Sequence, residues 1–161
     1  MSIDFSEYIK DADKAAIRLF EETGHQIAYH DDQYITEMAT IGRFGRHENE
    51  DDNNAIICIY AEVKGASIPH FHFYKSGIVT NTGGGCLTMK EERYFNHGTH
   101  TETLNSKEAK YLMKYLKSKP NGMDITVWHF MIYSWNANNP NSKIDINTPI
   151  PDYDKGIDPY K

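Results

Sequence analysis

The centre of the chain, residues 55–91, constrains the fold more than any other stretch. It holds short segments rich in Ile, Val, Tyr and Phe, separated by brief segments that contain Gly, Ser or Pro. Residues 55–63 (AIICIYAEV) are too apolar for a strand with one wet face, so they predict a central strand. Residues 70–75 (HFHFYK) and 86–91 (CLTMKE) predict further strands. Strands joined by brief turns favour an antiparallel sheet.

Two segments on either side of this centre show helical periodicity. An N-terminal helix is predicted over residues 6–24, between a serine suited to its start and a glycine suited to its end. A second helix is predicted over residues 106–119, before a proline. Asn105 and Glu108 at its start have the spacing of a capping box.

A third helix is predicted over residues 125–139, with Asp124 as its N-cap. Residues 141–161 hold three prolines and no period, so we expect residues 139–161 to run extended over the surface or to be mobile. Four large apolar residues of this helix form one buried stripe: Ile125, Trp128, Ile132 and Trp135.

These elements predict a single α+β domain over residues 1–161. Its antiparallel sheet would have about five strands, with further strands at residues 26–29 and around residues 40–46. The N-terminal helix and the two C-terminal helices would pack on one face of that sheet.

The net charge of the chain limits the ligands it can bind, and its cysteines indicate the cellular compartment in which it works. The net charge of −6 argues against a nucleic acid as the main ligand, because such binders need a basic surface. Cys58 and Cys86 lie in apolar runs and have no CxxC partner, which is typical of buried thiols in a reducing compartment. With no signal peptide and no membrane span in the sequence, we expect a soluble cytoplasmic protein.

The strand IPHFHFYKSG, residues 68–77, carries the candidate functional residues. Alternate residues of a strand share a face, so His70, His72 and Tyr74 point one way and the intervening phenylalanines the other. The phenylalanines should face the helices. The histidine face would then be wet, unless the loop after Tyr94 folds over it.

Metal binding is one interpretation of the two histidines. His70 and His72 could share a divalent transition metal such as zinc, with His97, His100 or a carboxylate as a further ligand. The strand is similar to the metal strand of cupins, but the glutamate that cupins place a few residues later is absent. The His-x-His pair by itself establishes no metal.

Proton chemistry is a second interpretation, in which the histidines serve a hydrolase as general acid and base on a phosphodiester. Two-histidine phosphoesterases carry two His-x-Thr/Ser motifs. Only His97-Gly-Thr fits here, because the third residue of the other candidate motif is His72.

Contact with a partner is the interpretation that the sequence favours. Histidine and tyrosine side chains pair across strands on a sheet face, so His70, His72 and Tyr74 could bind a protein or a small ligand. In a further alternative the protein is a structural component of a larger assembly or a homo-oligomer, and its C-terminal tail wraps a neighbour.

The stretch IICIYAEVKGASIPHFHFY resembles a family of small bacterial and phage proteins of unknown function, whose signature is an apolar strand, a turn and Pro-His-Phe-His. The likeness covers residues 55–75, and the layout of residues 86–98 and the Lys-rich helix after them is similar. The family is often encoded beside an antitoxin-like protein, so the resemblance implies a place in a toxin–antitoxin or phage–host conflict system. It implies no catalytic residues. This chain is longer than usual and has Gly-Ala-Ser-Ile before the proline, where further prolines are common.

Overall fold

The structure is a computed structural model that describes residues 26–30, 34–46, 51, 53–62, 68–80, 82–119 and 124–160. The predicted α+β class with an antiparallel sheet is confirmed. The helix predicted over residues 6–24 lies outside the described residues. Neither α-helix in the described part of the chain has the length and the apolar run that crossing a membrane requires.

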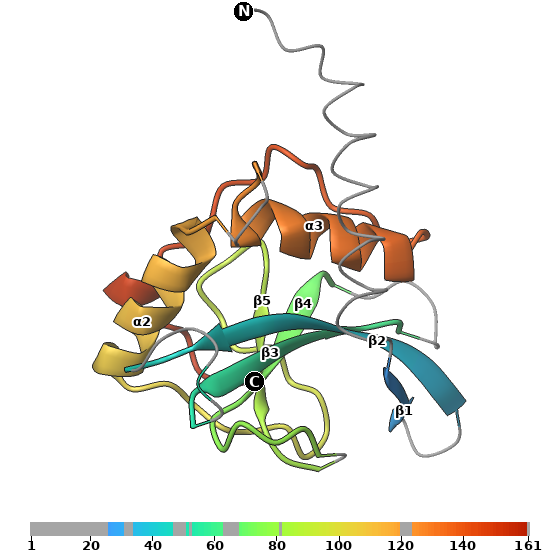
Figure 1. Cartoon of the computed structure of the whole chain (residues 1–161), viewed down its shortest axis with the longest axis horizontal. Coiled ribbons are helices and arrows are strands. Elements are labelled where there is room, and N and C mark those ends of the chain that lie inside the picture. The colour runs from blue at the N-terminus through green and yellow to red at the C-terminus, as the bar shows by residue number, and fades with distance from the viewer. Residues whose placement is uncertain are drawn as a thin grey trace, which may run out of the picture.

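The sheet consists of β1 (Gln26–His30), β2 (Tyr34–Phe44), β3 (Ala55–Tyr60), β4 (His70–Tyr74) and β5 (Gly85–Thr88). The strands lie side by side in chain order, and each neighbouring pair is antiparallel. Figure 1 shows the sheet across the middle of the molecule, with β1 near one end of it. The central strands β3 and β4 fall where the apolar pattern predicts them, whereas β2 begins earlier than residue 40.

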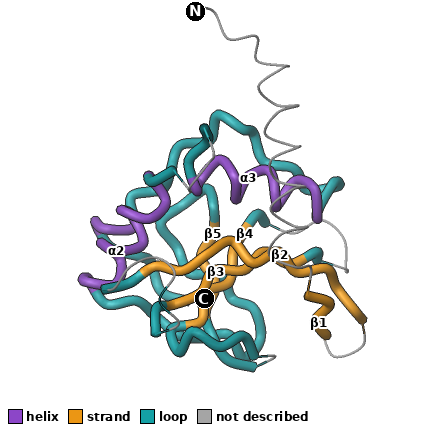
Figure 2. Tube along the Cα trace, in the orientation of Figure 1, coloured by secondary structure: helices purple, strands orange, loops and turns teal. Residues whose placement is uncertain are grey.

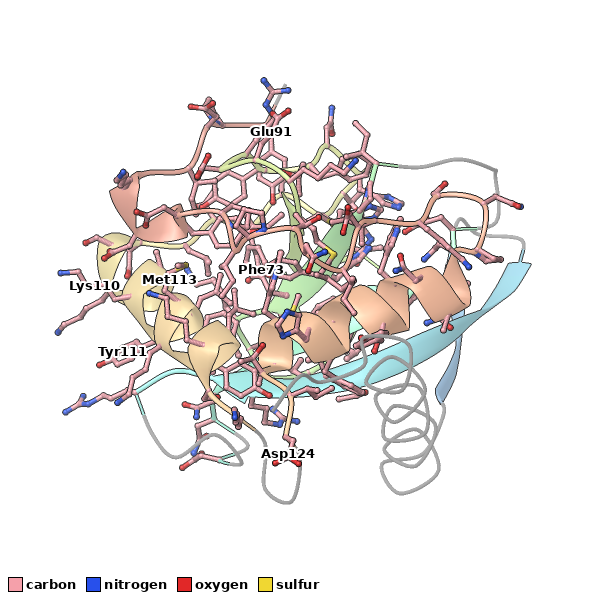
Figure 3. All side chains as sticks on the ribbon, turned by 90° about the horizontal axis from the view of Figure 1, so that it is seen from above. Phe73, Glu91, Lys110, Tyr111, Met113 and Asp124 are labelled. Carbon is pink, nitrogen blue, oxygen red and sulfur yellow. The ribbon has the colours of Figure 1, made fainter. Side chains whose placement is uncertain are left out.

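The helix α2 (Ser106–Lys117) follows the sheet, and its predicted capping box is confirmed. The Asn105 side chain accepts a hydrogen bond from the Glu108 backbone N–H, and the Glu108 carboxylate accepts one from the Asn105 N–H, both at 2.8 Å. The helix is amphipathic: Figure 3 shows Lys110 pointing away from the molecule, whereas Met113 is buried. Its apolar side therefore packs on the rest of the domain.

The helix α3 (Val127–Asn138) begins later than predicted, and Asp124 as its N-cap is wrong. The cap is Thr126, whose hydroxyl accepts a hydrogen bond from the His129 backbone N–H at 3.2 Å. Thr126 is the N-cap because its side-chain oxygen lies beside the first turn of the helix as it forms in the structure. The predicted apolar stripe is buried in full: Ile125, Trp128, Ile132 and Trp135.

The core lies between the helices and one face of the sheet. In Figures 1 and 2, α2 and α3 lie on the same side of the strands. Phe71 and Phe73 of β4 are fully buried in this core, as the alternation predicts. Their neighbours there come from the flanking strands and from both helices: Ile57, Ile59, Leu87, Leu112, Leu116, Met131 and Ile132.

A glycine in β2 allows α2 to approach the sheet closely. The pairing of β2 with β3 shifts register between Thr40 and Gly42. A Cβ atom at Gly42 would lie 1.8 Å from the Tyr115 hydroxyl oxygen, and that hydroxyl donates to the Ile41 carbonyl at 3.4 Å. Any side chain at this position would therefore displace the Tyr115 hydroxyl from its place against β2.

The C-terminal segment, residues 139–160, is attached to the domain at several points. The Trp128 indole donates to the Thr148 carbonyl at 2.8 Å, and the second tryptophan of α3 is anchored in the same way. Tyr153, in the short helix η1 (Tyr153–Lys155), is 1% exposed, and its hydroxyl donates to the Thr88 carbonyl of β5 at 2.6 Å. The segment therefore runs over the domain mostly without regular secondary structure, and it is fixed there by buried aromatic and apolar side chains.

Candidate metal centre

The histidine face of β4 is covered. His70 is 1% exposed, His72 0% and Tyr74 1%. The face is therefore not wet, because the loop after Tyr94 folds over these side chains, which is the exception that the strand alternation left open. A macromolecule cannot contact the three residues directly while that loop is in place.

The covering loop, residues 95–102, is hydrogen-bonded at one end to β5 and at the other to Gly84, the residue before β5. The Phe95 N–H donates to the Cys86 carbonyl and the Glu102 N–H to the Gly84 carbonyl, both at 2.9 Å. Between these bonds the loop lies over the histidine face, and the Phe95 ring stacks on His70 with 4.1 Å between ring centroids. These two backbone bonds thus fix where the side chains of the loop can reach.

The loop brings two further histidines to the first two. Gly98 has a positive φ of 60°, and the His100 N–H donates to the His97 carbonyl at 3.2 Å, which closes a tight turn. The ring centroid of His72 lies 5.3 Å from that of His97 and 4.9 Å from that of His100. Four histidines that are separate in the sequence therefore form one cluster.

Three of these histidines converge on a single carboxylate, that of Glu62. Its Oε1 lies 2.9 Å from His70 Nε2 and 3.9 Å from His72 Nε2, and its Oε2 lies 3.4 Å from His97 Nε2. The four ligand atoms all lie within 4.8 Å of one another. Three imidazole nitrogens and one carboxylate oxygen form a set that could hold a transition-metal ion.

Glu62 is held in place by the end of α3. Its backbone N–H donates to the Asn139 side-chain oxygen at 2.7 Å. The Asn139 amide nitrogen in turn donates to the carbonyls of Tyr60, at 3.0 Å, and of Trp135, at 3.2 Å. Asn139 is the C-cap residue of α3, so one side chain joins the end of β3 to the end of the helix.

The sequence held a signal for Glu62 that the pattern analysis missed. Cys58 pairs directly with His72 across the sheet, so the two side chains share a face. Counting in steps of two from Cys58 leads to Tyr60 and Glu62, the one acid in an apolar run. The carboxylate therefore comes from the chain directly after β3, before the histidines in sequence, whereas the cupin pattern places its glutamate after them.

The hydrogen bond of His70 fixes the tautomer of its ring. Nδ1 lies 2.7 Å from the Ile68 carbonyl oxygen, which can only accept, so Nδ1 carries the proton. In the neutral ring, Nε2 then turns a lone pair toward the Glu62 oxygen 2.9 Å away. Two facing lone pairs repel, so a cation between them or a second proton on the ring is needed. A ring held by a carbonyl at its other nitrogen is the usual arrangement for a metal-binding histidine.

His72 is bordered by a neutral thiol. Its Nδ1 lies 3.4 Å from Cys86 Sγ. Burial raises the pKa of the Cys86 thiol well above its usual value, and the nearby Glu62 carboxylate raises it further. Burial likewise raises the pKa of Cys58 to about 12. Both cysteines are free and buried, as predicted, and act here as neutral neighbours of the histidine.

Two of the candidate residues lie beside the set of four. His100 is 4% exposed, and its Nδ1 is hydrogen-bonded to the Gly83 carbonyl. Tyr74 points its hydroxyl at that of Tyr60, 2.9 Å away, and burial raises the pKa of both phenols. His97 together with a carboxylate, rather than His100, thus accompanies His70 and His72 in the described residues.

Comparison of the chain with family models, with curated proteins and with solved structures finds no match. The resemblance of residues 55–75 to the Pro-His-Phe-His family therefore stays a prediction.

Proposed function

We propose that the protein binds one divalent transition-metal ion through Glu62, His70, His72 and His97. The observation that supports this most is the convergence of four ligand atoms within 4.8 Å of one another, two of them from fully buried histidines. A carboxylate in such a place is costly unless a positive charge compensates it. One metal ion would compensate it and satisfy three imidazoles at once.

Zinc fits the dimensions of the set. Zinc bonds of about 2.1 Å in tetrahedral geometry hold ligand atoms about 3.4 Å apart. The distances from the Glu62 oxygens to the three histidine nitrogens, 2.9, 3.9 and 3.4 Å, bracket that value. Small side-chain adjustments would therefore suffice to place the ligands around the ion.

The chemistry of the donors favours zinc or another borderline metal over a soft one. Imidazole suits zinc, iron, nickel and copper(II), whereas copper(I) prefers sulfur. The sulfur atom nearest the set, that of Cys86, belongs to a thiol whose pKa burial raises, so it stays protonated.

A metal-dependent hydrolase is the second candidate function, and the ligand set favours it over a purely structural site. Structural zinc sites are built mainly from cysteines, whereas catalytic sites use histidine and carboxylate ligands and keep one position open. Here three histidines and a glutamate converge, and His97 is the most exposed of them at 15% of its side chain. In such an enzyme the metal would supply activated water, and Glu62 could either complete the ligands or accept a proton from that water.

Elemental analysis of protein purified without a histidine tag tests the proposal. After incubation with zinc and exhaustive dialysis, we expect about one equivalent of metal in the wild type. His97→Ala and Glu62→Gln should retain under about a tenth of an equivalent, because each removes one ligand. His97 lies on a loop and is partly exposed, so its replacement should leave the fold intact, which circular dichroism would check.

His129→Ala is the matched control, since His129 lies in α3 outside the cluster and its Nδ1 contacts the Thr126 hydroxyl. It should hold as much metal as the wild type. Wild-type protein that holds less than about a tenth of an equivalent after zinc incubation would contradict the proposal, as would full retention by both ligand variants.

A further inference from the structure

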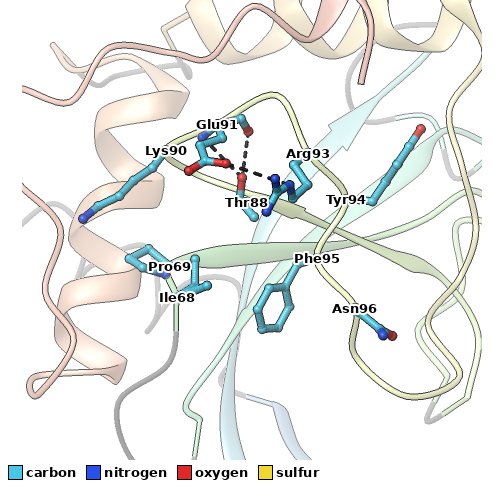
Figure 4. Close-up of a pocket in the computed structure, with 9 residues that line it drawn as sticks. All are labelled: Ile68, Pro69, Thr88, Lys90, Glu91, Arg93, Tyr94, Phe95 and Asn96. Carbon is cyan, nitrogen blue, oxygen red and sulfur yellow. Dashed lines mark hydrogen bonds and ion pairs between the residues drawn. The ribbon is translucent and has the colours of Figure 1, made fainter. Parts of the chain in front are cut away.

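A cavity of about 350 Å³ lies next to the proposed metal centre. Its volume is within the range of small-molecule sites. Figure 4 shows Ile68, Pro69 and Phe95 around its lower part, with Lys90 and Arg93 above them. None of the four proposed metal ligands lines this cavity, so it is a separate feature of the surface.

The cavity and the metal site share a wall. Ile68 lines the cavity and its carbonyl oxygen accepts the hydrogen bond of His70 Nδ1. Phe95 also lines the cavity, and its ring stacks on His70 with an interplanar angle of 20°. Asn96, the next lining residue, directly precedes His97. A molecule in the cavity would therefore press on groups that hold two of the proposed metal ligands.

The lower part of the cavity is apolar. Ile68 is 56% exposed there, which is unusual for a large aliphatic side chain in the described part of this chain. Pro69 and the half-buried Phe95 ring continue the apolar surface. Covering these groups with an apolar ligand would remove this surface from water, which favours binding.

The upper part carries two cations, Lys90 and Arg93, and one carboxylate, that of Glu91. Lys90 is exposed, and Arg93 keeps 38% of its side chain exposed. The described ion pair of the Arg93 side chain joins Nε to a Glu91 oxygen at 3.9 Å, a distance that uses little of the five-donor guanidinium group. A guanidinium group of this kind matches a planar carboxylate well.

We infer that this cavity binds a small organic carboxylate with a flat apolar body, the carboxylate at Arg93 and Lys90 and the body on Ile68 and Phe95. The position beside His70 makes the cavity the entry for a ligand that acts together with the metal; this part rests on the proposed function.

Calorimetric titration of the full chain with phenylacetate tests the site. We expect saturable binding at about one molecule per chain. Phenylacetamide, which has nearly the same shape without the charge, should bind about tenfold more weakly, because it loses a charge-assisted hydrogen bond. Arg93→Gln should weaken phenylacetate binding by a similar factor. Absence of saturation in the wild type, or equal affinity in Arg93→Gln, would overturn the inference.

Two further variants guard against misfolding and non-specific charge effects. Ile68→Glu places a carboxylate on a mostly exposed wall, so the fold should tolerate it while phenylacetate binding is lost. Lys155→Gln removes a cation that is 84% exposed on η1, outside the cavity, and should leave binding unchanged. If Lys155→Gln weakens binding as much as Arg93→Gln does, the contact is general charge attraction and the site is refuted.

Repeating the titration with cobalt(II)-loaded and with metal-free protein separates this inference from the proposed function. Phenylacetate should shift the visible absorption of the cobalt form, because its binding moves Phe95 against His70. Metal binding without phenylacetate saturation overturns the cavity and leaves the metal site. Saturable phenylacetate binding by a chain that takes up no metal overturns the metal site and leaves the cavity. Saturation with an unchanged cobalt spectrum refutes the coupling of the two sites.

Discussion

Glu62 and His70 carry the strongest chemical constraint at the scale of single residues. The Ile68 carbonyl at His70 Nδ1 forces the lone pair of the neutral ring toward a carboxylate oxygen 2.9 Å away. A protonated His70 ring would by itself remove the repulsion with the Glu62 oxygen. However, His72 and His97 also point ring nitrogens at the same carboxylate. Charging the buried rings of His70 and His72 as well would cost several kcal/mol for each. A single divalent ion would bind all three ring nitrogens and compensate the charge of the carboxylate.

Cys58 gives a residue-scale prediction about pH. Its pKa is about 12 in the folded protein because burial disfavours the thiolate, whereas the pKa of an exposed thiol is about 8.5. Above that pH the unfolded chain loses the proton first, so the free energy of unfolding falls as the pH rises. In urea unfolding, the wild type should lose about 2 kcal/mol more than Cys58→Ala between about pH 8 and about pH 10.

Ile57→Val is the control for this measurement. Ile57 is a fully buried neighbour with no titrating group, so the change should cost about 1 kcal/mol at both pH values alike. Equal pH dependence in the wild type and Cys58→Ala would show that Cys58 does not hold its proton in the folded state.

At the scale of elements, the site depends on the meeting of β3, β4, α3 and the covering loop. Asn139 joins two of these, since it caps α3 and binds the backbone on either side of Ala61. Glu62 follows β3 rather than lying in it, so without Asn139 the chain after Tyr60 would lose its anchor. Asn139 is thus a positioning residue for the proposed ligand.

Asn139→Ala should lower zinc affinity about 10- to 100-fold, the usual effect of removing a group that orients a ligand. Competition with a chromophoric chelator would measure it. Asn136→Ala is the matched control. The Asn136 side chain lies in the same helix and bonds the backbone of Ile144, and it makes no described bond to Glu62. Both variants should lose stability, but only Asn139→Ala should lose zinc affinity; equal affinities would assign Asn139 a structural role alone.

At the scale of the whole molecule, local sequence patterns predicted the helices and strands better than the contacts between them. The alternation in β4 and the capping box of α2 involve near neighbours in the chain, so the sequence could show them. The N-cap of α3 was misplaced because Asp124 and Thr126 are both suitable residues, and only the packing of the helix selects one.

The site needed contacts between residues far apart in the chain. His70 and His72 were candidates from their spacing, and His97 was a candidate from its type. That His97 reaches them depends on the bonds of the covering loop to β5, which no local pattern encodes. Glu62 could have been found by extending the face of β3. The buried anchors of the tail were missed because its prolines suggest exposure, whereas Tyr153 fixes it from within.

Anomalous diffraction at the zinc edge, from crystals of untagged protein grown with zinc, tests whether these four residues bind one metal ion. We expect one strong peak about 2.0 to 2.2 Å from a nitrogen of each of His70, His72 and His97, with a Glu62 oxygen as the fourth ligand or beside a bound water. Ordered side chains at these four positions with no anomalous peak among them would show that they do not bind zinc.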